Sequence, residues 1–336
     1  MQNLVKKIQT TAHQQNLWEK NSKIVLGVSG GPDSICLLQV FLQLQKKYPL
    51  ELIIAHVNYG LRGKDSEADE KFVRELAVKN NLSIEVLRVK QVNSAKVEPL
   101  NSQKTVRRFN LGTVKASENS LREIRYNFFE KIRTEKKFDL IAVAHNSDDQ
   151  VETYLMRILR GAGLQGLSAM KWHNGKIIRP LLATSRKEIL EFLRNENLTY
   201  RTDKTNAESL FLRNKIRNKL IPYLEKNYNP NIKQTILDST SSISQDHDCL
   251  NELAEKVYQK NKVLSVKKIL SLHPALQKRL LLKIIAEKKS NTKDVSAHNI
   301  DEMLKILHSS KGKNQTLLFQ GLKMTRKGDK VTISKT

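Results

Sequence analysis

The chain has 336 residues, 39% of them hydrophobic, so it can bury at least one sizeable core, and its length suggests roughly two domains. Its 59 Lys and Arg residues against 34 Asp and Glu residues leave a formal charge of +25, which favours nucleic acid as a partner, although a genome rich in lysine codons would also explain the excess. The chain has only two cysteines, outside any C-x-x-C pair, which excludes a disulfide scaffold and a cysteine-held zinc or iron–sulfur site. No apolar run is long enough to span a bilayer, which excludes a membrane anchor. Together these features predict a cytoplasmic protein.

Four short β-branched runs alternate with helical patterns in the first part of the chain. They cover 23–28, 52–57, 83–89 and 138–144. Because these runs are apolar on both faces, they favour a parallel sheet covered by helices on each side. The expected fold is therefore α/β, with a doubly wound and mainly parallel sheet. Capping boxes at Ser66 with Asp69 and at Ser185 with Glu188 are expected to begin two of the helices.

A glycine-containing loop follows the first expected strand. Its residues are Ser29, Gly30, Gly31, Pro32, Asp33 and Ser34. The glycine pair lets backbone amides approach an anion closely, the two serines add hydroxyl donors, and Asp33 could hold a magnesium ion that bridges phosphates. The spacing fits neither the Walker A loop nor the dinucleotide fingerprint. We predict a phosphate site here, with an ordinary strand-to-helix turn as the alternative.

Residues 90–118 are polar and basic and show no sustained periodicity. We interpret them as a flexible basic insertion loop, with an RNA-contacting flap as the alternative.

A second polar cluster, 145–153, follows the fourth expected strand and enters a helix. Ligands of open α/β sheets bind at the carboxyl ends of the strands, so this cluster is expected to face the same crevice as the first loop. Asp149 and Glu152 share one helical face, where two carboxylates suit an ammonium group. The alternative is that they only complement the helix dipole. The apolar face of this helix is expected to comprise Val151, Leu155, Ile158 and Leu159.

The glycines between 161 and 166 follow that helix, and we interpret them as a helix stop and a packing turn. From about residue 231 the strand–helix alternation ends and helical patterns dominate. We expect a catalytic domain over 1–225 and a basic, mostly helical domain over 231–336. Two strand-like runs, 316–319 and 330–333, are expected to close the second domain as a strand pair around a turn.

The first loop resembles that of the PP-loop ATP pyrophosphatases, which adenylate a carbonyl oxygen and release pyrophosphate. The cluster 145–153, followed by R-G-x-G-x-x-G-L at 160–167, is closely similar to the signature of the tRNA(Ile)-lysidine synthetase family within that superfamily. Further matching segments are 56–62, 121–126, 179–186 and 213–217, so the resemblance covers roughly residues 20 to 225. Tyr59 departs from the pattern, because the family often has histidine there.

The resemblance implies an ATP-dependent ligase that joins free lysine to the unmodified wobble cytidine of tRNA(Ile) and releases AMP and pyrophosphate. Residues 29–34 would bind ATP, with magnesium at Asp33, and Asp149 and Glu152 would bind the lysine. The other expected catalytic residues are His145, Arg122, Arg125 and Arg213, the arginines contacting phosphate or the flipped-out base. The C-terminal domain would bind the tRNA body. No prosthetic group, zinc or iron–sulfur cluster is expected, and a homodimer is left open.

Two other classes of function remain to be weighed. A synthetase that adenylates a small molecule would explain the phosphate loop but not the basic charge. A non-enzymatic RNA-binding protein would explain the charge but not the pairing of a phosphate loop with a carboxylate cluster.

Overall fold

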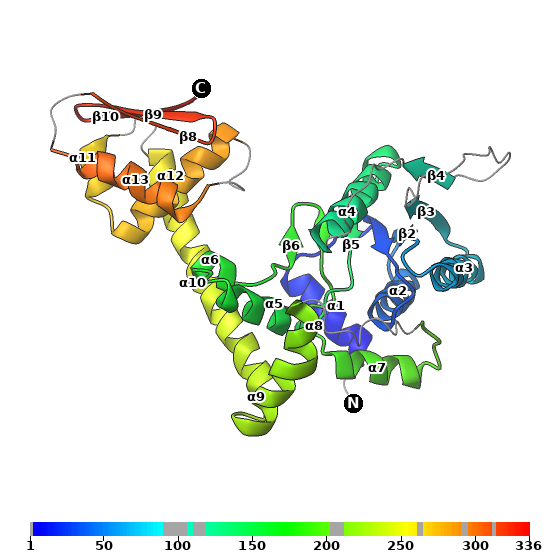
Figure 1. The fold of residues 1–336 in the computed structure, drawn as a ribbon. Helices are drawn as coiled ribbons and strands as arrows, with labels where there is room; N and C mark the ends of the chain where they lie inside the picture. The colour runs from blue at the N-terminus through cyan, green and yellow to red at the C-terminus, as the bar shows by residue number, and fades with distance from the viewer. Residues whose placement is uncertain are drawn as a thin grey trace. The chain divides into compact units, whose positions relative to one another are not determined.

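The structure is a computed structural model that describes residues 3–89, 106–109, 118–201, 212–260, 265–289, 295–310 and 314–336. They form two compact units, Met1–Thr240 and Ser241–Thr336 (Figure 1). The division falls within helix α10 (Ile232–Lys260), because Ile236 near the start of that helix packs with Val151, Ile216 and Ile221 of the first unit. No helix in these ranges is both long enough and apolar enough to cross a membrane.

The first unit is built around one sheet. Its elements are α1 (Leu4–Gln14), β1 (Lys23–Gly27), α2 (Pro32–Gln45), β2 (Glu51–Asn58), α3 (Lys64–Lys79), β3 (Ser83–Val89), β4 (Val106–Phe109), α4 (Glu118–Glu135), β5 (Leu140–Ala142), α5 (Ser147–Leu159), α6 (Leu164–Leu167), β6 (His173–Asn174), β7 (Ile177–Ile178), α7 (Arg186–Asn195), α8 (Leu212–Lys215), the π-helical turn η2 (Ile216–Leu220), α9 (Ile221–Asn227) and the start of α10. The strand order is β4-β3-β2-β1-β5-β7-β6, and every pair is parallel except the β6–β7 hairpin.

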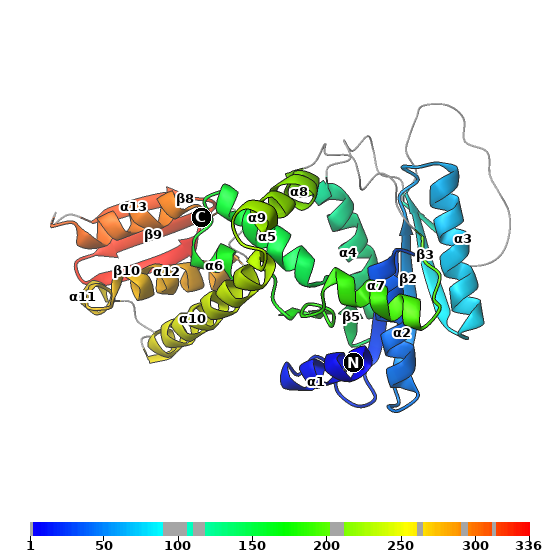
Figure 2. The ribbon, with the colours of Figure 1, turned by 90° about the horizontal axis from the view of Figure 1, so that it is seen from below.

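Alternate residues of the strands point to opposite faces of this sheet, and both faces are buried. Ile24 and Leu26 of β1 belong to a core shared with α1, α2, α3 and α7. Val25 of β1 and Ile53 of β2 belong to a second core, which Phe128 of α4 helps to close. Figure 2 shows α3 and α4 on opposite sides of the strands. The expected doubly wound, mainly parallel α/β fold is confirmed.

Strand β1 lies at the point where the direction of winding changes. Helix α2 leaves β1 and leads to β2 on one side, whereas α4 leads to β5 on the other side of β1, and the two helices cover opposite faces. At such a switch point the connections diverge and leave a crevice at the carboxyl ends of the strands. The loops after β1 and β5 therefore border one crevice.

Three local predictions for the first unit are wrong. Val106–Phe109, inside the expected insertion loop, form β4, which pairs in parallel with β3; residues 90–105 and 110–117 lie outside the described ranges. A run of four residues is too short to show the two-residue hydrophobic period of a strand. It forms a strand because its backbone pairs with the edge of β3. Ser66 does not cap a helix, because α3 has already begun at Lys64. Ile158 and Leu159 are about half exposed rather than part of the apolar face of α5.

The second unit packs helices against one face of a small sheet. It contains the rest of α10, α11 (Val266–Leu270), α12 (Pro274–Lys289), α13 (Ala297–His308), β8 (Gln315–Phe319), β9 (Leu322–Lys327) and β10 (Lys330–Lys335). The sheet is antiparallel with the order β10-β9-β8, so three strands form where a pair was expected. Strand β9 occupies part of the expected Gly- and Lys-containing turn, and its Leu322 and Met324 alternate into the core.

Candidate functional site

The loop after β1 is held in shape by its own serines. Ser34 Oγ donates to the carbonyl of Gly31 (2.8 Å) and accepts the backbone N–H groups of Ser29 and Gly30, both at 3.2 Å. Gly30 has a φ of +93°, which a side chain would strain. The buried His56 contacts the loop from β2, with Nδ1 2.8 Å from the carbonyl of Val28. The backbone of the loop is therefore fixed in place before any ligand binds.

Helix α2 begins directly at this loop, with Gly31 as its N-cap and Pro32 in its first turn. No side chain in the described ranges caps it, so N–H groups of its first turn remain for a ligand. The partial positive charge of a helix N-terminus favours an anion at that place. The N-terminus of α2 thus supports the prediction that residues 29–34 form a phosphate site.

A cavity of about 210 Å³ opens beside the loop, between the ends of β1, β2 and β5. Its walls include apolar side chains of the sheet core that α4 covers, namely Ala55, Val57, Phe129 and Val143. Tyr59, the residue that departs from the family pattern, also lines it and donates its hydroxyl to the carbonyl of Leu121 at 3.0 Å. An apolar slot next to an anion site can hold a flat aromatic base next to a phosphate.

His145 lines the same cavity from the end of β5. Burial, with the guanidinium of Arg179 nearby, lowers the pKa of His145 well below its usual range, so the imidazole is neutral at pH 7. Arg179 Nε lies 3.3 Å from His145 Nδ1 and donates to it. Because Nδ1 accepts from Arg179, the neutral imidazole carries its proton on Nε2 and can donate a hydrogen bond to a ligand without adding charge.

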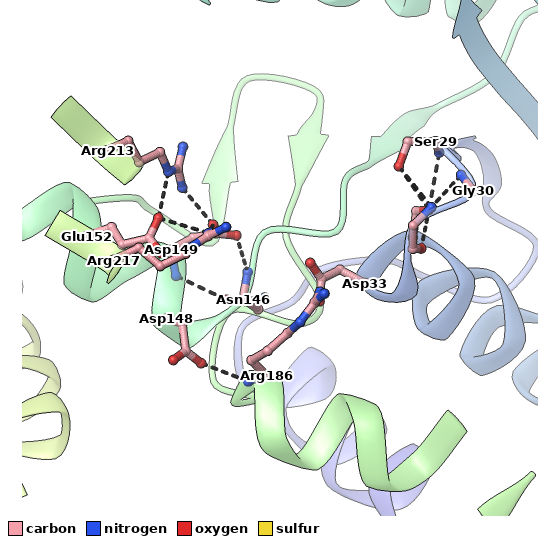
Figure 3. A network of polar contacts seen from close by, with 12 residues as sticks. Ser29, Gly30, Asp33, Asn146, Asp148, Asp149, Glu152, Arg186, Arg213 and Arg217 are labelled. Atoms are coloured by element: carbon pink, nitrogen blue, oxygen red, sulfur yellow. Dashed lines mark hydrogen bonds and ion pairs between the residues drawn. The ribbon is translucent and has the colours of Figure 1, made fainter. Parts of the chain in front are cut away.

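Asp33, in the first turn of α2, forms an ion pair with Arg186, the first residue of α7 (Figure 3). Burial raises the pKa of Asp33, and the guanidinium of Arg186 only partly opposes this effect. Arg186 is tied down at its backbone as well, because its N–H donates to Asp148 Oδ2 at 2.7 Å. The carboxylate that was expected to hold magnesium is thus covered by a cation of the chain itself.

Asp149 and Glu152, expected to bind an ammonium group, both face guanidinium groups (Figure 3). Arg213 Nη2 lies 2.6 Å from Asp149 Oδ1, and Arg213 Nε lies 2.6 Å from Glu152 Oε2. Arg217 Nε adds a contact of 2.5 Å to Glu152 Oε1. Two carboxylates and two guanidiniums balance one another in charge, and Glu152 is only 1% exposed.

Asp149 has a second role, which sequence reasoning did not identify. Its Oδ2 accepts the backbone N–H of Asn146, and Asn146 Oδ1 accepts the N–H of Asp149, both at 3.0 Å, which forms a capping box at the start of α5. Capping fixes the direction of the Asp149 carboxylate and leaves Oδ1 for Arg213.

A larger cavity of about 610 Å³ adjoins the phosphate loop. Its walls carry acidic and basic side chains together, including Asp33, Arg186, Glu152 and Arg217. Lys233 also lines it, with Nζ 3.3 Å from both Asp148 Oδ1 and Glu225 Oε1. A multiply charged ligand entering here would exchange these internal pairs for contacts with itself.

The arginines of α4 take different positions. Arg125 lines the apolar cavity and lies over the Tyr126 ring, with Cζ 5.4 Å from the ring centroid. Arg122 also lies over Tyr126, at 5.1 Å, and is not among the residues that line either cavity. The chain thus brings the phosphate loop, His145 and Arg125 to one cavity, and Asp149, Glu152 and Arg213 to a neighbouring cluster.

Sequence reasoning gave no site role to four cations that the structure places here, Arg179, Arg186, Arg217 and Lys233. For Arg217 a signal existed, since it follows Arg213 by four residues and so shares its helical face. The glycine segment at 161–166 is a helix stop, as expected, because Gly161 follows α5 with a φ of +73° and Arg157 Nη1 binds the carbonyls of Gly166 and Ala169.

Comparisons with known proteins agree with this architecture. A family model described as a PP-loop domain matches residues 2–224. The tRNA(Ile)-lysidine synthase of Clostridium tetani is 37% identical to this chain, over 91% of this chain and 64% of the relative. That of Clostridioides difficile is 33% identical, over 98% and 70%. The chain thus spans about two thirds of the length of these relatives. The U34-tRNA thiolase NcsA of Methanococcus maripaludis shares the fold, with a TM-score of 0.54, 20% identity, and coverage of 72% of this chain and 78% of that one.

Proposed function

This chain belongs to the tRNA(Ile)-lysidine synthase family of PP-loop proteins, and from that membership we propose that it ligates free lysine to the wobble cytidine of the isoleucine tRNA that decodes AUA. The reaction consumes ATP and yields lysidine, AMP and pyrophosphate. The observation that supports this best is the convergence of two polar loops at one switch point. The loop after β1 offers an anion site, and the loop after β5 begins a helix with two carboxylates.

ATP would bind across the crevice. Its base suits the apolar cavity of Ala55, Val57, Phe129 and Val143, and its phosphates suit the start of α2. The cytosine carbonyl oxygen attacks the α-phosphate and pyrophosphate leaves, so AMP is joined to the base through that oxygen. The fixed N–H groups at Asp33 and Ser34 stabilise the charge that develops on the phosphates.

Magnesium fits this proposal with Asp33 as a single protein ligand. Among the described residues no group of three or more His, Cys, Asp or Glu side chains could hold a metal ion. Magnesium in ATP-using sites is often held by only one or two carboxylates, with phosphate oxygens and waters completing its shell. When bound, it would neutralise charge on the leaving pyrophosphate. Arg186 would then leave Asp33 and remain near the phosphates as a second positive charge.

The lysine would bind at the cluster of Asp149 and Glu152. Its ammonium group can take the place of one guanidinium on these carboxylates, and the displaced Arg213 is then free to contact the lysine carboxylate or a phosphate. The amine must lose a proton before it attacks the activated carbon, and a carboxylate of this cluster can accept that proton. Attack forms the new carbon–nitrogen bond and releases AMP.

The tRNA body would bind the basic C-terminal unit, and His145, Arg122 and Arg125 would lie near the reacting cytidine. Lysine and arginine contacts to phosphates release counterions, so the affinity for tRNA should fall steeply as the salt concentration rises. A flat salt dependence would count against this electrostatic role. The cytoplasmic location and a homodimer belong to the same proposal, and sedimentation of the purified chain tests the latter.

One assay separates this proposal from its rivals. The protein is incubated with labelled lysine, ATP and unmodified tRNA(Ile), and label in the tRNA is counted. We expect incorporation with the wild type, its loss in Asp149→Ala, and its retention in Glu51→Gln, which changes an exposed ion pair with Lys23. ATP consumption without tRNA labelling would favour a small-molecule synthetase. RNA binding without ATP consumption would favour a non-enzymatic RNA-binding protein.

A further inference from the structure

The helical segment from α8 through η2 to α9 presents two different faces. One face carries Arg213, Arg217, Ile221 and Glu225 at intervals of four residues. Arg213 and Arg217 bind the Asp149–Glu152 cluster, Ile221 is 3% exposed in the core, and Glu225 binds Lys233. This face is fully used by the site already described.

The other face carries lysines and tyrosines. Lys215, Lys219, Tyr223 and Lys226 follow one another at intervals of three or four residues, and all four are exposed. The three lysines have no carboxylate partner within 4.0 Å in the parts of the chain that the structure describes. Tyr228, just beyond α9, completes the surface. We call these five residues the lysine–tyrosine face.

The two tyrosine rings are unusually open to solvent. Tyr223 is 55% exposed and Tyr228 is 71% exposed, and their ring centroids lie 5.8 Å apart at an interplanar angle of 59°. They pack against each other rather than into a core. Exposed aromatic rings beside lysines without a carboxylate partner among the described residues match the chemistry of single-stranded nucleic acid, in which bases stack on rings and phosphates meet cations.

The position of this face relates it to the catalytic crevice. Pro222 and Glu225, neighbours of Tyr223 in α9, line the larger cavity next to the phosphate loop. Tyr223 does not itself line that cavity, but it belongs to the same short helix, α9, whose opposite face forms part of the cavity wall. A base that enters the cavity must leave its stack, so the nucleotides flanking it are unstacked as well and need new partners.

We propose that the lysine–tyrosine face binds the single-stranded anticodon loop, with Tyr223 and Tyr228 stacking on nucleotides that flank the reacting cytidine and the lysines binding their phosphates. The inference deepens the proposed function and rests on it. The proposed partner is RNA, because three cations and two exposed rings complement a phosphate backbone with exposed bases, and the described helical segment carries no acidic residue on this face.

The test uses the full chain and a short RNA hairpin with the anticodon loop, carrying a fluorescent purine analogue next to the cytidine. Stacking on a ring changes the fluorescence of the analogue. Tyr223→Leu with Tyr228→Leu keeps apolar bulk but removes the rings, and should weaken hairpin binding about tenfold or more and remove the fluorescence change. Tyr223→Phe with Tyr228→Phe is the matched control, and should bind like the wild type.

The lysines are tested by the salt dependence of the same binding. Changing Lys215, Lys219 and Lys226 together to glutamine should reduce the slope of log affinity against log salt by about 2, as expected for three single-strand phosphate contacts. ATP affinity without RNA should stay unchanged in every variant, which shows that the fold is intact.

Two outcomes would separate this inference from the proposed function. If the wild type transfers lysine to tRNA while the leucine pair binds the hairpin as tightly as the wild type, the lysine–tyrosine face is not the anticodon surface. If the wild type transfers no lysine but the leucine pair still loses hairpin binding, the surface stands and the proposed reaction fails.

Discussion

Arg186, at the start of α7, forms an ion pair with Asp33, in the first turn of α2. The two helices pack on the same face of the sheet, and their N-termini meet at the phosphate loop. A guanidinium thus covers the carboxylate that we propose for magnesium. If magnesium binds there with ATP as proposed, it would separate this pair, which makes both residues sensitive probes of the proposal.

We predict that Asp33→Asn weakens magnesium–ATP binding at least tenfold without destabilising the protein at pH 7. Burial raises the pKa of Asp33, so the protonated carboxyl stabilises the fold below the unfolded pKa of 3.8, and this contribution is lost as the pH rises through the folded-state pKa. Asparagine resembles the protonated form at every pH. Titration calorimetry with magnesium and ATP, and urea unfolding at pH 7, measure the two effects. A large loss of stability in Asp33→Asn would contradict the prediction.

Removal of the Glu152 carboxylate is expected to destabilise the first unit. Glu152 is 1% exposed and binds Arg213 and Arg217, so Glu152→Gln leaves two guanidiniums facing Asp149 alone. Breaking a buried ion pair on one side typically costs about 3 kcal/mol or more. The matched control is Glu51→Gln, which breaks an exposed, solvent-screened pair with Lys23 and should cost much less. Urea unfolding compares them, and equal losses would refute the prediction.

Glu70 should make the fold sensitive to acid. Burial opposes its ionisation, but hydrogen bonds from Arg88, Asn58 and Arg74 outweigh burial and lower the pKa of Glu70 to about 2. A lowered pKa gives stability that is present above the unfolded value of 4.5 and is lost as the pH falls towards 2. Because Arg74 and Arg88 are partly exposed and water screens their charges, this contribution is at most about 3 kcal/mol.

The measurement is the free energy of unfolding as a function of pH. Between pH 4.5 and 2 the wild type should lose more stability than Glu70→Gln, which keeps the shape of the side chain but has no charge to lose. Parallel curves for the two proteins would show that Glu70 is not the group responsible.

His145 is predicted to stay neutral across the physiological range. Burial and the neighbouring Arg179 lower its pKa, so its imidazole proton resonances should not shift between pH 5.5 and 8. A titration of His145 near pH 6.5 would contradict this, and would mean that the site tolerates an additional positive charge.

Many elements of the fold could be predicted from short stretches of the sequence. The four predicted strands, the capping box of Ser185 with Glu188 and the helix stop at Gly161 all form. Each depends on residues close together in the sequence. Strand β4 and the exposure of Ile158 could not be found in this way, because an edge strand and an uncovered helix face depend on which distant element packs beside them.

The sequence by itself determined the family, and it predicted the place of the candidate site. Residues 29–34 and 145–153 carry the matching motifs, and parallel strands bring their carboxyl ends to one edge. Only the tertiary structure decided which charges meet there. Arg186 on Asp33 and the Arg213–Arg217 pair on Asp149 and Glu152 join residues far apart in the chain. Such pairs form because burial makes an unpaired charge costly, and no local pattern specifies which partner folding will supply.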